Sequence, residues 1–138
     1  MNDPELVEKK LAQIETFVAQ LRELADPAKI ETDIREARFV EHTLQIAIQA
    51  ALDVASHIVS DARLGEPESS RDLFRLIESR GWISAELSAT LQAMTGFRNL
   101  LVHGYGEVDL RIVRDVIENR LDDLLDFVAA TRRRLLQR

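Results

Sequence analysis

The residues with the clearest chemical potential lie close together in the second half of the chain. Arg98, His103 and Tyr105 fall within eight residues, and glycines stand around them at positions 96, 104 and 106. A histidine can take a proton from a ribose 2′-hydroxyl or give one to a leaving 5′-oxygen. An arginine can stabilise the extra negative charge that develops on phosphorus. Arg98 and His103 together therefore supply what metal-free cleavage of RNA requires.

The same residues also have an ordinary structural interpretation. The apolar spacing predicts a helix that ends near His103, with Gly104 directly after it. A histidine at a helix C-terminus is favoured by the helix dipole, and Tyr105 could pack on Leu100 in the turn that follows. Composition and spacing alone leave the catalytic and the structural interpretation both open.

A polar stripe marks the long helix predicted in the first half of the chain. Its members recur every three or four residues, with His57 on the flank of Asp53: Gln45, Gln49, Asp53, Ser56 and Ser60. A solvated helix face normally carries Lys, Glu and Arg, whereas this stripe is mostly uncharged. It suits a partly buried surface, such as a cleft or a seam between two copies, and an ordinary exposed face is the alternative.

Helical periodicity runs through nearly the whole chain, and no segment alternates with the period of a strand. Asp3, Ser84 and Asp109 are expected to begin helices, and Gly65 and Gly81 to end them. We therefore expect an all-α antiparallel bundle of four main helices and one short helix, forming one domain over residues 1–138. The expected helices cover about 4–25, 30–64, 71–80, 84–103 and 109 to the C-terminal arginines.

Composition excludes several classes of protein and site. The chain has no cysteine, three histidines and no apolar run of membrane-spanning length, so we expect no disulfide, no metal, no cofactor and no membrane partner. Its first residues lack the layout of a signal peptide, which predicts a cytoplasmic protein. The net charge of −6 argues against a general nucleic-acid coat protein. However, residues 1–69 carry −7 and residues 70–138 carry +1, so an anion site is expected in the second half.

The segment from Arg98 to Tyr105 reads Arg-Asn-Leu-Leu-Val-His-Gly-Tyr. It resembles the R-x4-H-x-Y motif of HepT-like toxins, a branch of the HEPN superfamily. The resemblance extends over roughly residues 35–128. Within that range, residues 44–57 look like the long second helix of the family, and residues 74–82 look like its short third helix and the following turn.

The resemblance implies an activity and a partner. It implies a metal-independent endoribonuclease that acts on mRNA or tRNA as the toxin of a type VII-like toxin–antitoxin pair. The implied antitoxin is an MntA-like minimal nucleotidyltransferase, which silences the toxin by transferring AMP from ATP to a tyrosine. By position, Arg98 and His103 would be the catalytic pair and Tyr105 the AMP acceptor. Asn99 would be the polar residue that commonly follows the arginine.

The resemblance also implies a two-fold homodimer, in which the arginines and histidines of both protomers share a cleft. Asp53 has a family counterpart, and we expect it to support the site together with His57. Positions five apart on an ideal helix diverge by about 140°, so Arg98 and His103 should not meet on one regular helix. A dimer would bring second copies of both residues into one cleft, and the glycines near the helix end would let His103 turn.

Two other functions compete with catalysis. The chain could be a catalytically silent HEPN dimer that binds a nucleotide or a nucleotidyltransferase, or it could be a purely structural helical dimer. The presence of Arg98, His103 and Tyr105 together favours the enzyme, because a silent module would tolerate their loss. The acidic net charge favours the silent module, because the field of the whole protein would not attract RNA.

Overall fold

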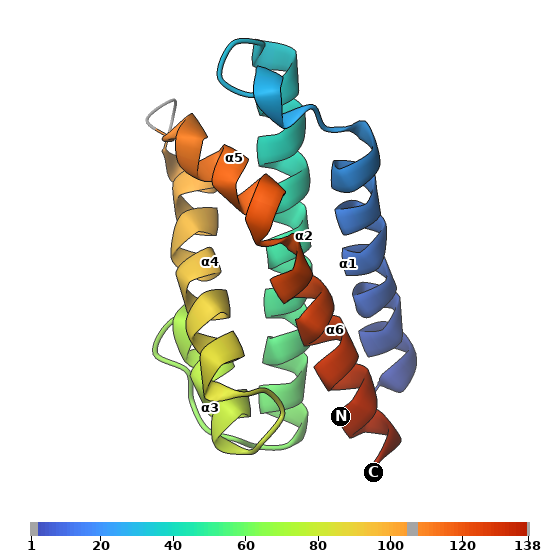
Figure 1. Cartoon of the computed structure of the whole chain (residues 1–138). Helices are drawn as coiled ribbons and strands as arrows, with labels where there is room; N and C mark the ends of the chain where they lie inside the picture. Colours follow the sequence, from blue (N-terminus) through green and yellow to red (C-terminus); the bar gives the residue numbers. More distant parts are fainter. Residues whose placement is uncertain (1–2, 105–107, 138) are drawn as a thin grey trace.

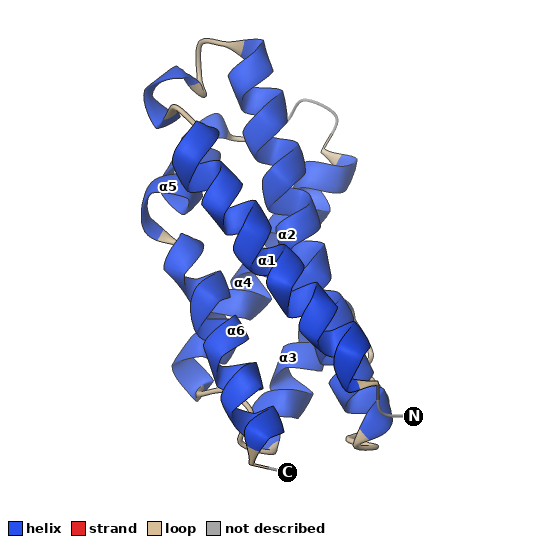
Figure 2. Ribbon diagram, turned by 90° about the vertical axis from the view of Figure 1, so that its right-hand side faces the viewer, coloured by secondary structure: helices blue, strands red, loops and turns tan. Residues whose placement is uncertain are grey.

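The computed structural model describes residues 3–104 and 108–137, and this part of the chain is helical with no strand (Figure 1, Figure 2). The prediction of an all-α chain is therefore confirmed. A short 3-10 turn, η1 (Pro27–Lys29), connects the first two helices. The α-helices are α1 (Pro4–Leu24), α2 (Ile34–Asp61), α3 (Ser70–Ser79), α4 (Ala85–His103), α5 (Leu110–Asn119) and α6 (Leu121–Leu136).

The long helices lie along a common axis, and α2 stands between α1 and α4 (Figure 1). Along the chain, α1, α2, α4 and α6 run alternately up and down this axis, as the short connections predict. The shorter α3 and α5 pack near opposite ends of α4. Both chain termini lie at the end of the molecule where α4 begins, so the C-terminal end of α4 lies at the far end.

Polar side chains begin the helices where the sequence predicts. The Asp3 carboxylate accepts a hydrogen bond from the Leu6 backbone N–H at 3.1 Å, and the Ser84 hydroxyl accepts one from Leu87 at the same distance. Asp109 accepts one from the Arg111 backbone at 2.9 Å. Each cap satisfies a backbone donor that has no partner inside its helix.

The expectation of one continuous helix after Asp109 is wrong. The segment divides into α5 and α6 at Arg120, whose backbone leaves the helical region with φ −121° and ψ 0°. The apolar spacing continues through this break without a glycine or proline, so the sequence gives no local signal. The break has a tertiary cause, because both helices contact α2 but α5 also packs on η1, whereas α6 packs on α1 and α4.

The second helix is shorter than expected, since it covers Ile34–Asp61 and not 30–64. Asp33 caps its start by accepting a hydrogen bond from the Arg35 backbone N–H at 2.9 Å. Ile30 is fully buried but belongs to the turn before the helix. Because Ile30 has the apolar character and spacing of the helix, the expected helix began about one turn too early.

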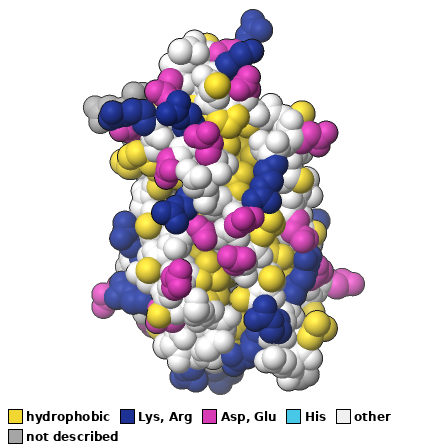
Figure 3. Space-filling view, in the orientation of Figure 1, with side chains coloured by type: hydrophobic (Ala, Val, Ile, Leu, Met, Phe, Trp, Pro, Cys, Tyr) yellow, Lys and Arg dark blue, Asp and Glu magenta, His cyan; other side chains and the backbone are white. Residues whose placement is uncertain are grey.

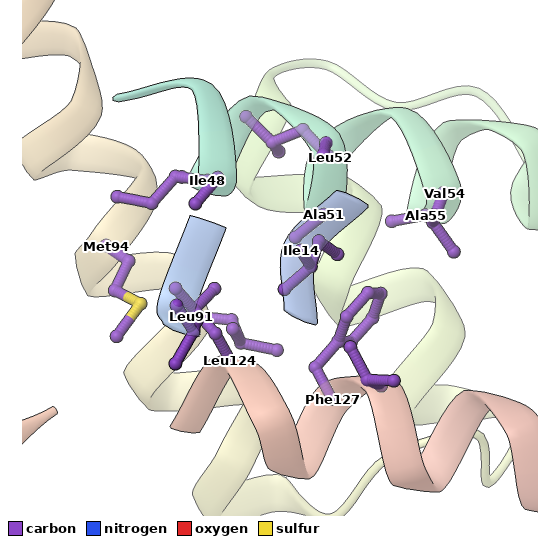
Figure 4. Close-up of a cluster of buried hydrophobic side chains, with 14 of the residues drawn as sticks. Ile14, Ile48, Ala51, Leu52, Val54, Ala55, Leu91, Met94, Leu124 and Phe127 are labelled. Carbon is purple, nitrogen blue, oxygen red and sulfur yellow. The ribbon is translucent and has the colours of Figure 1, made fainter. Parts of the chain in front are cut away.

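The hydrophobic core lies between the four long helices, with α2 contributing the largest share (Figure 4). Small alanines on α2 allow close packing of its neighbours. Phe127 of α6 meets Phe74 of α3 edge to face, with 5.9 Å between ring centroids. The core residues labelled in the figure are Ile14 from α1, Ile48, Ala51, Leu52, Val54 and Ala55 from α2, Leu91 and Met94 from α4, and Leu124 and Phe127 from α6. Among the described residues, no helix is both long and apolar enough to cross a membrane.

Truncation of the central aromatic residue should cost much of the stability. Phe127 is completely buried, so Phe127→Ala should lower the free energy of unfolding by about 3–5 kcal/mol, through lost burial and the cavity left beside Phe74. Urea unfolding followed by circular dichroism measures this change. Leu136 is 87% exposed, and Leu136→Ala, as the matched control, should stay within about 0.5 kcal/mol. Equal effects of the two changes would contradict this description of the core.

Candidate active site at the end of helix α4

Arg98 continues the core-facing line of α4. The preceding members of that line, Leu91, Met94 and Thr95, are buried, and Arg98 is half-buried. The phase of the helix therefore directs Arg98 toward packed surface. Aliphatic stems of arginines commonly lie along apolar surface in this way, while the charged head needs a polar partner.

The Arg98 guanidinium lacks such a partner within the described part of the chain. Its Nε atom is buried and receives no hydrogen-bond acceptor there, and no described carboxylate pairs with it. A buried donor of a charged group without a partner costs free energy. Several other arginines of the chain do hold carboxylates: Arg22, Arg38, Arg75, Arg111, Arg114 and Arg132.

His103 is the last residue of α4 and is exposed. The following backbone N–H, of Gly104, still donates to the Leu100 carbonyl at 2.7 Å, so the helical geometry persists through His103. The expectation that a glycine-flanked end lets His103 turn is therefore wrong. On this regular helix, the two side chains leave the axis about 140° apart. One chain alone does not bring Arg98 and His103 together.

Gly104 makes this helix end possible because the backbone there is tightly packed. Its φ of −75° is ordinary, so no unusual backbone angle requires glycine. A Cβ atom at this position would instead overlap the Leu100 carbonyl oxygen and lie 3.1 Å from Cγ2 of Val108. The residue directly after the candidate histidine must therefore be small.

Asn99 and Tyr105 complete the motif. Asn99 is exposed and lies four residues before His103, on nearly the same side of α4. Tyr105 lies outside the described residues, so both its expected role as AMP acceptor and its alternative role in a helix-end turn stay predictions. No group of three or more His, Asp or Glu side chains in the described part of the chain could hold a metal ion.

Asp53 and His57 make their described contacts with α1 and with their own helix. The Asp53 carboxylate accepts hydrogen bonds from Lys10 Nζ at 3.2 Å and from Gln49 Nε2 at 2.9 Å. His57 Nε2 accepts one from the Asp3 backbone N–H at 3.3 Å. The bonds that leave α2 thus join it to α1 and its capping residue, and none of the three hydrogen bonds reaches Arg98 or His103.

Sequence analysis missed two residues beside the candidate site, Arg38 and His42 of α2. They border a hollow of about 490 Å³ between α2 and the end of α4, which Gln45, Leu101 and Val102 also line. The signal was available, because Arg38, His42 and Gln45 continue the polar stripe toward the start of the helix at the same spacing. The stripe therefore begins two turns earlier than predicted and reaches the residues next to His103.

The opposite face of the molecule differs in character. Figure 3 shows the face on which α5 and α6 lie, and no histidine is visible on it. A hollow of about 580 Å³ between the start of α4 and α6 contains the carboxylates of Glu86, Asp123 and Asp126. Burial raises the pKa of Asp123, and the nearby Asp126 adds to the effect. These three carboxylates outnumber Arg133, which also lines the hollow, so the hollow disfavours a polyanion, and it contains none of the predicted site residues.

Comparison with known proteins shows the family. The family model for HepT-like ribonucleases matches residues 7–131. The mRNA nuclease HepT of Shewanella oneidensis is 34% identical over 129 residues, which cover 93% of this chain and 96% of the relative. The tRNA nuclease HepT of Aphanizomenon flos-aquae is 25% identical over 78% of this chain and 74% of its own length.

Comparison of the fold with solved structures also finds toxin–antitoxin complexes. A solved structure of the tri-AMPylated HEPN toxin of Shewanella oneidensis, in complex with an MNT antitoxin, superposes with a TM-score of 0.87 at 33% identity. The match covers 96% of this chain and 99% of that one. A toxin–antitoxin complex with AMP-PNP matches with a TM-score of 0.88 at 31% identity, over 94% of this chain and 98% of that one. The chain therefore belongs to the family of HepT-like ribonucleases and is an RNA endonuclease.

Proposed function

We propose that this protein is a metal-independent endoribonuclease toxin whose catalytic residues are Arg98 and His103. The observation that carries the proposal is the buried, unpartnered guanidinium nitrogen of Arg98 on the same helix as the exposed His103. A cation that no described group of the chain neutralises is suited to an anion from outside. An RNA phosphate provides that anion, and His103 provides the proton transfer that cleavage needs.

The proposed reaction uses the 2′-hydroxyl of the RNA as nucleophile. His103 takes the 2′-hydroxyl proton while the 2′-oxygen forms a bond to phosphorus. The bond from phosphorus to the 5′-oxygen then breaks, and a protonated His103 of the second protomer gives its proton to that oxygen. Arg98 stabilises the added negative charge on the non-bridging oxygens. The products are a 2′,3′-cyclic phosphate and a 5′-hydroxyl, and the reaction needs no co-reactant.

A two-fold homodimer would assemble this site. Two observations support it: Arg98 and His103 diverge on one helix, and the polar stripe of α2 is half-buried at Gln45 and Gln49. Leu100, an apolar residue next to Asn99, is also 56% exposed in the single chain. A partner copy would cover Leu100 and supply the second histidine.

The proposed regulator is an MntA-like nucleotidyltransferase antitoxin that transfers AMP to Tyr105. The support is the likeness to the AMPylated HEPN toxin bound to its MNT antitoxin. An attached AMP phosphate could pair with Arg98 in place of the RNA phosphate. We propose that the pair acts in the cytoplasm on mRNA or tRNA, and that residues 1–138 form one such domain. The alternative, a silent dimer that binds a nucleotide or the antitoxin, is favoured only by the net charge of −6.

The catalytic assignment is tested first by His103→Ala. Loss of the proton-transfer group should slow RNA cleavage by about 10²–10⁴-fold, with circular dichroism and Tm unchanged, because the side chain is exposed. Arg98→Ala should slow cleavage comparably. Gel analysis of RNA incubated with each variant, with and without EDTA, measures the effect, and we expect EDTA to change nothing. Unimpaired cleavage by His103→Ala, or inhibition by EDTA, would refute the assignment.

Regulation is tested by Tyr105→Phe, which removes only the acceptor hydroxyl. We expect the variant to stay folded, to cleave RNA, and to escape silencing by the cognate nucleotidyltransferase with ATP. Intact-mass spectrometry should show AMP-sized additions on the wild type alone. The same additions on Tyr105→Phe would place the acceptor on another residue.

Pairing is tested by light scattering coupled to size-exclusion chromatography. The wild type should have twice the mass of its 15.7 kDa chain at micromolar concentration. Leu100→Glu would bury a charge in the proposed seam, so it should shift the protein toward monomer and reduce cleavage together. Leu136→Glu is the exposed control and should stay dimeric. A monomeric wild type that cleaves RNA would contradict the shared site.

A further inference from the structure

Arg71, in the first turn of α3, lies in an unusual position against α4. A Cβ atom built on Gly96 would overlap the Nη2 atom of the Arg71 guanidinium and lie 3.3 Å from its Cζ atom. The guanidinium therefore occupies the space that a side chain at position 96 would take. Glycine costs a helix interior about 0.5–1 kcal/mol relative to alanine, and here it makes room for a cation that another helix supplies.

Arg71 is free of ion pairs within the described residues, and it is exposed. The adjacent carboxylate, Asp72, is already engaged on both oxygens. One oxygen pairs with Arg75 at 2.6 Å, and the other accepts the Glu68 backbone N–H at 2.8 Å. Like Arg98, Arg71 is thus a cation that no described carboxylate neutralises.

Helical geometry places Arg71 on the side of α4 that carries His103. Gly96 and His103 are seven residues apart, so they leave the helix axis within about 20° of each other. Asn99 lies between them on nearly the same side and is exposed, as His103 is. The rise of ~1.5 Å per residue separates positions 96 and 103 by about 10 Å. A stacked nucleic-acid strand advances about 3.4 Å per nucleotide, so this distance matches about three nucleotides.

We propose that Arg71, seated on Gly96, binds an RNA phosphate about two or three nucleotides from the phosphate that is cut. This inference rests on the proposed function, and it assigns α3 the part of positioning the substrate along α4. Arg71 does not touch the reacting atoms. It holds the strand so that the scissile phosphate lies at His103, with Asn99 between the two points. A planar guanidinium suits this task because it can donate two hydrogen bonds to one phosphate.

The direct test measures RNA binding without cleavage. In a His103→Ala background, fluorescence anisotropy with a fluorescein-labelled, mixed-sequence single-stranded RNA gives Kd at several salt concentrations. Arg71→Ala should weaken binding about 10-fold and reduce the slope of log Kd against log salt by about 0.7, the value for one lost phosphate contact on a single strand. Arg75→Ala, one turn later on α3 and already paired with Asp72, is the matched control and should change Kd less than 2-fold.

A second variant displaces the guanidinium but keeps its charge. Gly96→Ala should push the flexible end of Arg71 aside without lowering Tm, and should also weaken RNA binding several-fold. In the active protein, Arg71→Ala should raise KM about 10-fold and change kcat less than 2-fold, which a purely structural role would not do. Unchanged Kd and salt slope in Arg71→Ala, or equal losses in Arg71→Ala and Arg75→Ala, would overturn the proposal. Normal cleavage by His103→Ala would refute the proposed function, whereas an inactive His103→Ala protein whose Kd is unchanged by Arg71→Ala would refute only the role of Arg71.

Discussion

The regular geometry of α4 is the constraint on which the candidate site depends. Each residue advances the side-chain direction by a fixed angle, and the hydrogen bond from Gly104 to Leu100 shows that the helix keeps this angle to its last residue. Arg98 is therefore directed into the protein and His103 outward. The helix separates the two groups that the proposed reaction combines. A second chain, an RNA strand or both must complete the arrangement.

The other helices of the bundle fix the position of α4. The core residues of α2 pack against both α1 and α4, so one central helix sets the position of the others (Figure 4). The same α2 presents Arg38, His42 and Gln45 next to the end of α4. The contacts of Asp53 with Lys10 and of His57 with Asp3 join α2 to α1. One polar stripe thus serves two purposes along α2: it attaches the helix to α1 at one end and lines the hollow beside the end of α4 at the other.

The sequence allowed a good prediction of whatever depends on local pattern. Helical periodicity predicted an all-α chain, and capping side chains located the helix starts at Asp3, Ser84 and Asp109. What depends on distant contacts was not predictable. The break at Arg120 arises because α5 and α6 pack on different neighbours, and no residue at that point signals it. The position of Arg71 beside Gly96 could not be predicted for the same reason, since only the tertiary fold brings α3 against α4.

The unpartnered Nε of Arg98 has a consequence for how such a gene changes over generations. A half-buried guanidinium whose Nε lacks an acceptor among the described residues adds little to the stability of the fold, and an apolar residue of similar length would remove the desolvation cost of that nitrogen. A mutation that disarms the protein at this position therefore meets no resistance from protein quality control. A cell harmed by the proposed nuclease activity could therefore lose that activity through a substitution at position 98 that leaves the protein stable. With the proposed catalytic role, the activity is what keeps an arginine at position 98, because stability alone would favour its replacement.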